Sequence, residues 1–200
     1  MAFVTDDKLD LLFDPKLIPD SVRKLVGSDL HIRPLALSDY ERGHLKVMQV
    51  LTSTPDPGKE AYQEAFRRMQ TSKPASYFIL CIIDKSKDQL LAIGSVFLEY
   101  KFIRNLGICG HIEDIAVDAA AQGKGLGKKL ILALTELSES LGSYKVILDC
   151  SEENKGEPGR VGSIQDFEVL TASLPSPLTA GFYEKCGYKY KGAQMAKYKE

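Results

Sequence analysis

The sequence Cys109-Gly-His-Ile-Glu-Asp-Ile-Ala-Val-Asp118 is followed, after three alanines, by Gln122-Gly-Lys-Gly-Leu-Gly127 and then by an amphipathic run that ends at Leu141. The first part is rich in β-branched residues, which favour strands. In the last part leucine and isoleucine recur at spacings of three and four, which is typical of a helix with one apolar face. The stretch therefore predicts a strand, a glycine-rich turn and a helix, in that order.

The turn predicts a site for a phosphate group. Gly123, Gly125 and Gly127 have no Cβ atoms, so the backbone amides at the start of the helix can point at an anion. The positive end of the helix dipole adds to this attraction. A Walker A loop is excluded because no Ser or Thr follows Gly-Lys, and Lys128 stands where a dinucleotide fingerprint has its third glycine. We interpret the turn as a pyrophosphate site, with an ordinary glycine-rich turn as the alternative.

The rest of the chain alternates between apolar strands and amphipathic helices. We expect strands at 30–35, 77–84, 90–100, 144–150 and 188–198, and helices at about 39–51, 59–71 and 182–188. This order predicts an α/β domain with a mixed central sheet flanked by helices. Ser38 or Asp39 is the expected cap of the helix at 39–51, and Pro34 places the first strand at an edge of the sheet.

Composition limits the other possibilities. A net charge of −1 over 200 residues does not favour a surface for nucleic acid or another polyanion. The four cysteines lack metal-ligand spacing and predict buried, reduced thiols, with no metal site. The chain has no apolar segment of membrane length and no basic region of a signal peptide at its start, so we expect a cytoplasmic protein. Residues 1–28 are expected to be a weakly ordered leader, and residues 29–200 a single domain.

Particular residues point to a family. Gln122, Gly125 and Gly127 fit Gln/Arg-x-x-Gly-x-Gly/Ala, which resembles the acetyl-CoA loop of the GNAT superfamily of N-acetyltransferases. Within that superfamily, the segments 110–117, 144–150, 153–154 and 182–188 look like the eukaryotic glucosamine-6-phosphate N-acetyltransferases. The resemblance covers residues 29–154 and 181–198.

The resemblance implies the GNAT acyl-CoA N-acyltransferase fold and acetyl-CoA as co-substrate, without a metal. It implies N-acetylation of D-glucosamine 6-phosphate by direct attack of the amine on the thioester, in UDP-N-acetylglucosamine biosynthesis. It also implies a homodimer whose last strand crosses to the partner, so that the sugar site lies at the interface. The alternatives are acetylation of another small amine or a peptide, and a non-catalytic acyl-CoA-binding module.

The resemblance also implies site residues. Contacts to acetyl-CoA would come from Ile115, Ala116, Val117, Gln122, Gly123, Lys124, Gly125, Leu126, Gly127, Asn154, Tyr183, Glu184 and Lys185. Contacts to the sugar phosphate would come from Thr52, Lys101, Arg104, Glu113, Asp114, Ile115, Asp149 and Tyr198. Catalytic roles would fall on Asp149 near the amine from the neighbouring subunit, on Tyr183 as proton donor to the leaving sulfur, and on Glu113 in orienting the acceptor.

Each catalytic assignment has a structural alternative. Glu113 and Asp114 are adjacent in a strand, where side chains alternate between faces, so one of them could be a solvated or structurally bonded acid. Asp149 could make a structural hydrogen bond to a loop. Tyr183 could be a core aromatic side chain.

Residues 156–180 separate Lys155 from Gly181, whereas in the family the matching segments follow each other almost directly. The segment holds three of the nine prolines and no steady periodicity, which predicts an irregular surface insertion. A retained intron is the alternative hypothesis, because Gly156-Glu157 and Ala180-Gly181 can be encoded by splice-site-like sequences.

Overall fold

The computed structural model describes residues 2–149 and 180–189. In these residues five strands form one sheet in the order β1-β2-β3-β4-β5. Their bounds are Leu30–Pro34, Tyr77–Asp84, Gln89–Tyr100, Ile108–Val117 and Ser143–Leu148. Strands β1 to β4 pair antiparallel, and β5 pairs parallel to β4. The sheet is therefore mixed, as expected, and β1 with Pro34 lies at its edge.

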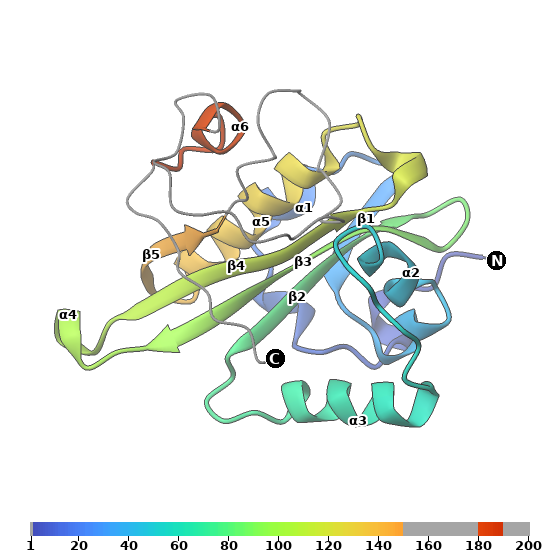
Figure 1. The fold of residues 1–200 in the computed structure, drawn as a ribbon, viewed down its shortest axis with the longest axis horizontal. Coiled ribbons are helices and arrows are strands. Elements are labelled where there is room, and N and C mark those ends of the chain that lie inside the picture. Colours follow the sequence, from blue (N-terminus) through green and yellow to red (C-terminus); the bar gives the residue numbers. More distant parts are fainter. Residues whose placement is uncertain (1, 150–179, 190–200) are drawn as a thin grey trace.

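Helices cover both faces of this sheet (Figure 1). On one face, α5 (Leu126–Ser140) and α1 (Asp20–Lys24) pack against the apolar side chains of the larger buried cluster. On the other face, Val47 of α2 (His44–Met48) and Phe66 of α3 (Lys59–Gln70) belong to a second cluster. Burial of these two clusters is the main favourable contribution to the stability of the fold.

The first residues differ from the expected weakly ordered leader. Residues 2–28 contain the short helices η1 (Asp6–Lys8) and η2 (Pro15–Leu17) as well as α1. Their apolar side chains are buried in the core, at Leu12, Ile18, Val22 and Val26. The sequence pattern missed this because helices of three to five residues are too short to show an apolar periodicity.

The segment 37–51 also differs from expectation. Instead of one helix it forms η3 (Leu37–Tyr40) and α2, separated at Gly43, which has φ 88°. Asp39 does not cap a long helix, because its carboxylate accepts two hydrogen bonds of 2.7 Å from the buried guanidinium of Arg33. It also accepts one from the amide of Ala36.

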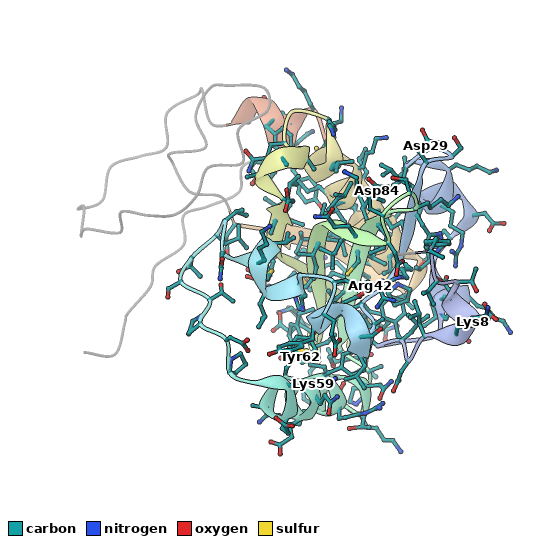
Figure 2. The ribbon with its side chains drawn as sticks, turned by 90° about the vertical axis from the view of Figure 1, so that its right-hand side faces the viewer. Lys8, Asp29, Arg42, Lys59, Tyr62 and Asp84 are labelled. Atoms are coloured by element: carbon teal, nitrogen blue, oxygen red, sulfur yellow. The ribbon has the colours of Figure 1, made fainter. Side chains whose placement is uncertain are left out.

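Side chains on the flank of the molecule that carries α2 and α3 are drawn in Figure 2. Arg42 bonds Asp88 across the fold at 2.9 Å, and Lys59 pairs with Glu41 at 2.7 Å. Tyr62 of α3 is within 2.8 Å of Nδ1 of His44, and burial lowers the pKa of that imidazole to about 4. The imidazole of His44 is therefore neutral near pH 7.

The β3–β4 hairpin extends beyond the rest of the sheet and carries α4 (Ile103–Leu106) at its tip (Figure 1). The tip exposes the apolar side chains of Phe102, Ile103 and Leu106 beside Arg104 and Asn105, and Phe102 is 95% exposed. Within the described residues, no helix is long and apolar enough to cross a membrane.

Candidate active site

An extra residue in β4 decides where the two adjacent acids lie. Ile93 of β3 pairs with Ala116, but Ser95 pairs with Glu113, so β4 has one residue more than β3 between these two pairs. This is a β-bulge, and Asp114 within it has φ 54°, in the left-handed region. Because the bulge interrupts the alternation of the strand, Glu113 and Asp114 are both exposed.

The bulge also changes which face of the sheet the next side chain lies on. Ile115 packs against the cluster beneath α5, on the same side as Ile112. Gly94 lies opposite on β3, and a Cβ there would overlap Cδ1 of Ile115 and lie 2.9 Å from Cδ1 of Leu134. The glycine in the interior of β3 therefore leaves room for the side chains of Ile115 and Leu134.

Three carboxyl groups meet at the bulge, and we call Glu113, Asp114 and Asp149 the acid group. Partial burial raises the pKa of Glu113, and the charges of Asp149 and Asp114 raise it further. Burial also raises the pKa of Asp114. Asp149 of the same chain reaches the group because β5 ends at Leu148, which pairs with Ile112 immediately before the bulge. The resemblance to the family implied instead the Asp149 of a neighbouring subunit.

Beyond this point no described residue pairs with the β5 side of β4. Strand β5 stops opposite Ile112, whereas β4 continues to Val117. In the part of the chain that the structure describes, no strand pairs with residues 113–117 on the β5 side, and we call these residues the open half of β4. An extended ligand can bind backbone groups here as an additional strand would.

The glycine-rich turn lies between the open half of β4 and α5. Asp118 accepts a hydrogen bond from the amide of Ala120 in η4 (Ala119–Ala121), and the side chain of Gln122 donates to the carbonyl of Val117 at 3.3 Å. Gly123 and Gly125 have φ 78° and 73°, and a Cβ on either would have no atom within 4 Å. Among residues 2–149 and 180–189, the space beside the turn is therefore open.

The start of α5 has the properties of an anion site. Within the part of the chain that the structure describes, no side chain caps the helix, whose first residues are Leu126 and Gly127. Both are buried, while Lys124 on the turn is exposed. Uncapped amides beside an open space, with a lysine nearby, fit the pyrophosphate of a nucleotide cofactor.

Tyr183 and Glu184 lie in the short helix α6 (Ala180–Glu184), and Lys185 follows it directly. Tyr183 is half-buried against Phe182, and the other two side chains are exposed. Gly187 follows with φ 88°, and the amide of Tyr188 donates to the carbonyl of Tyr183 at 3.0 Å. A glycine with positive φ is typical of the residues that follow a helix. The helix ends at Glu184, earlier than the expected 182–188.

A contact that the sequence did not suggest fixes this segment to α5. The hydroxyl of Tyr188 lies 2.5 Å from Oγ1 of Thr135. Thr135 also donates to the carbonyl of Ile131 one turn earlier. A hydroxyl pair of this kind has no local sequence signal, because its members are far apart in the chain.

The residues expected to bind the sugar phosphate are not gathered at one place. Lys101 forms an ion pair of 2.6 Å with Glu99 on the hairpin, whereas Arg104 is exposed at the tip with φ 55°. Thr52 is exposed, and its carbonyl accepts from Thr54. Among the described residues, no hydrogen bond or ion pair joins any of these three to the acid group. Asn154 and Tyr198 lie outside the described residues.

Comparison with known proteins identifies this arrangement. Residues 45–157 match the model of the acetyltransferase (GNAT) family. Glucosamine 6-phosphate N-acetyltransferase 1 from Dictyostelium discoideum is 35% identical over 174 residues, which is 87% of this chain and 94% of that protein. Glucosamine 6-phosphate N-acetyltransferase from Arabidopsis thaliana is 36% identical over 84% of this chain and 95% of that protein.

Solved structures agree. The crystal structure of glucosamine-6-phosphate N-acetyltransferase from Arabidopsis thaliana superposes with a TM-score of 0.70 at 35% identity, covering 86% of this chain and all of that one. The chain therefore belongs to the acetyltransferase (GNAT) family, whose members use acetyl-CoA. Within this family its relatives are glucosamine 6-phosphate N-acetyltransferases, as the sequence motifs predicted.

Proposed function

We propose that this protein transfers the acetyl group of acetyl-CoA to the amine of D-glucosamine 6-phosphate. The observation that carries the proposal is the position of the acid group at the bulge, beside the open half of β4 and between it and the end of β5. An extended thioester bound along that edge would have its reactive end beside three carboxylates. Such a site suits a small polar amine with several hydroxyl groups. The names of the relatives give the same acceptor.

Acetyl-CoA would be held by backbone groups. The amides at the start of α5 and in the turn 122–127 would bind the pyrophosphate, and the open half of β4 would pair with the pantetheine arm through Ile115, Ala116 and Val117. Because this edge ends at the bulge, an amide there can donate to the oxygen that becomes negative during the reaction. Gln122 supports the turn through its bond to Val117.

The acceptor would be oriented by the acid group. Glu113 and Asp114 would accept hydrogen bonds from sugar hydroxyls, and Asp149 would accept a proton from the amine. The neutral amine attacks the thioester carbon, the bond from carbon to sulfur breaks, and Tyr183 gives its proton to the sulfur. A phenol with an ordinary pKa of about 10 holds this proton at neutral pH. Because a sugar amine is a weak base, positioning contributes more than strong base catalysis.

We also propose that two copies form a dimer through the hairpin. Phe102, Ile103 and Leu106 are 95%, 64% and 68% exposed, and contiguous apolar surface of this kind marks contact sites between proteins. The patch continues onto β5, because Gly107 lies against the half-exposed ring of Tyr144. A dimer through this face would bring Lys101 and Arg104 of one copy towards its partner, which suits the role expected for them in phosphate binding.

Thiol release from acetyl-CoA tests the function with three acceptors side by side: glucosamine 6-phosphate, glucosamine and a lysine peptide. We expect turnover with the phosphorylated sugar, and its loss in Asp149→Asn. Turnover with the peptide and with neither sugar would show that the acceptor is a peptide amine rather than the proposed sugar amine. Binding of acetyl-CoA without turnover on any acceptor would favour a non-catalytic acyl-CoA-binding module. The place in UDP-N-acetylglucosamine synthesis and the cytoplasmic location remain predictions from the sequence.

Light scattering of the purified protein tests the dimer, with Phe102→Asp as the variant. We expect twice the mass of one chain for the wild type and a lower mass for the variant. An unchanged dimer in Phe102→Asp would show that the hairpin is not part of the interface. An active wild-type monomer would show that the reaction does not need a dimer.

A further inference from the structure

Three side chains that the proposed reaction does not use meet on the β3–β4 hairpin. Glu99 and Cys109 are direct partners in the strand register, and His111 is two residues beyond Cys109 on the same face of β4. Nε2 of His111 and Oε2 of Glu99 are 2.9 Å apart. The carboxylate, thiol and imidazole donors all lie within 4.8 Å of one another. In the sequence these residues have no metal-ligand spacing, because the strand pairing brings them together.

This donor set suits a particular class of ion. Zinc binds thiolate, imidazole and carboxylate at about 2.0–2.3 Å in tetrahedral sites. Tetrahedral geometry then places any two of its ligands about 3–4 Å apart. Side-chain rotations are enough to reach that separation here, and two paired strands hold the three Cα atoms in place. Water would be the fourth ligand, since the described residues offer no fourth donor of this kind.

Access to the site is from the solvent side. Cys109 is fully buried, while the side chains of Glu99 and His111 are 40% and 29% exposed above it. An ion entering from solvent would separate the Glu99–His111 pair and reach the sulfur beneath. The thiol would release its proton to solvent as the bond from sulfur to metal forms.

We propose that Glu99, Cys109 and His111 form a binding site for Zn²⁺ or another thiophilic divalent ion, and that the bound ion takes Glu99 away from Lys101. Nζ of Lys101 now lies 2.6 Å from Oε2 of Glu99, the same oxygen that contacts His111. The metal and the lysine compete for this oxygen. The consequence for catalysis rests on the proposed function, in which Lys101 contacts the sugar phosphate: with its partner lost, Lys101 changes position and phosphate binding weakens.

Cobalt(II) is the probe for the site itself, since a bond from a thiolate to cobalt gives a near-ultraviolet charge-transfer band. We expect the full chain, reduced without added thiols, to show this band at one cobalt per chain and to lose it on addition of zinc. His111→Gln should lower the affinity at least about tenfold, and Cys109→Ala should abolish the band. His31→Gln is the matched control, because His31 also pairs with a carboxylate at 2.8 Å, that of Asp6, but its two-residue pair has no thiol.

The absence of the band in folded wild-type protein would overturn the site. So would a band that persists in both Cys109→Ala and His111→Gln, because another cysteine would then be the ligand. This measurement needs no acetyl transfer, so it is independent of whether the proposed function is correct.

The proposed effect of the bound ion on Lys101 is tested with zinc held at fixed free concentrations by a chelator. We expect zinc to raise the KM for glucosamine 6-phosphate several-fold in the wild type but not in His111→Gln, with a smaller effect on plain glucosamine. Formation of the N-acetyl sugar should be followed, because the released CoA thiol itself binds zinc. An equal effect on both sugars, or none on either, would overturn the link to Lys101.

Discussion

Glu113 is a carboxyl group whose environment favours its protonated form. Its pKa is raised by partial burial first and then by the charges of Asp149 and Asp114. A carboxyl group with a raised pKa binds its proton more tightly in the folded chain than in the unfolded one. Its contribution to the stability of the fold is therefore present at low pH and is lost as the pH rises through the folded-state pKa.

The raised pKa of Glu113 leads to a prediction for the variant Glu113→Gln. We expect the variant to have a higher Tm than the wild type at neutral pH, since repulsion within the acid group is removed, and no advantage below about pH 4, where the wild-type carboxyl is protonated in both states. Acetyl transfer should fall. Thermal unfolding across pH checks the first part, with Asp29→Asn on the exposed turn before β1 as control (Figure 2). A variant that is less stable at pH 7 would contradict the assignment.

Gly94→Ala tests the bulge from the opposite strand. The new methyl group would overlap Ile115 and crowd Leu134, so we expect the variant to lose about 1–3 kcal/mol of unfolding free energy. Because Ile115 is displaced, acetyl-CoA should bind more weakly. Denaturant unfolding and calorimetric binding measure the two effects. Ser95→Ala is the control, as it removes only a hydrogen bond from Ser95 to the carbonyl of Glu113; equal effects in both variants would argue against a steric cause.

The bulge shows what residue patterns can and cannot predict. The sequence predicted that Glu113, Asp114 and Asp149 belong to one region, because the family motif contains them. Strict alternation, however, placed the two adjacent acids on opposite faces. An extra residue in one strand depends on its pairing with the next strand, and it is seen in the register of β3 and β4 and in the left-handed conformation of Asp114.

At the scale of elements, α6 depends on one side chain of α5. The pair of hydroxyl groups at Tyr188 and Thr135 joins the segment after α6 to the middle of that helix. Tyr188 also packs on the larger buried cluster. Since the amide of Tyr188 bonds the carbonyl of Tyr183, a shift of Tyr188 would displace the proposed proton donor.

Tyr188→Phe separates this attachment from packing, because it removes only the hydroxyl. We expect a loss of about 1 kcal/mol in unfolding free energy and a several-fold increase in the KM for acetyl-CoA. Thr135→Val should give the same result, and the double variant should be no worse than either single one. Tyr40→Phe is the control, since its hydroxyl bonds the exposed Asp56. Additive effects in the double variant would show that the two hydroxyls act separately.

Strands and long helices were the elements that the sequence predicted best. Strand β2 and the start of α3 were placed at the residues where the structure has them. The short elements were missed for two reasons. Val22 of α1 is buried with side chains of α5, which is distant in the chain. Asp39 bonds the buried guanidinium of Arg33, six residues earlier, instead of capping a long helix.

For the whole molecule, the insertion expected at 156–180 remains a prediction from the sequence, and a deletion tests it. Removing it joins Lys155 to Gly181, shortens the connection between β5 and α6, and also removes Ala180, the first residue of α6. A shorter loop costs less entropy to close, so we expect the deletion to stabilise the protein by on the order of 1 kcal/mol and to keep acetyl transfer. Chemical unfolding and thiol release measure this in parallel on both lengths. A deletion that no longer folds would show that the insertion belongs to the domain, and sequencing the transcript would decide whether a retained intron encodes it.

The open half of β4 has a consequence for the protein without its cofactor. Backbone donors and acceptors that lack a neighbour attract the edges of other chains, which natural sheets avoid by covering or charging such edges. Here the acids of the bulge supply charge at one end, while Ile115, Ala116 and Val117 offer none. Bound acetyl-CoA would then cover this edge and keep other chains from pairing with it. Stocks prepared with CoA should stay clear on storage, whereas the bare enzyme should slowly self-associate.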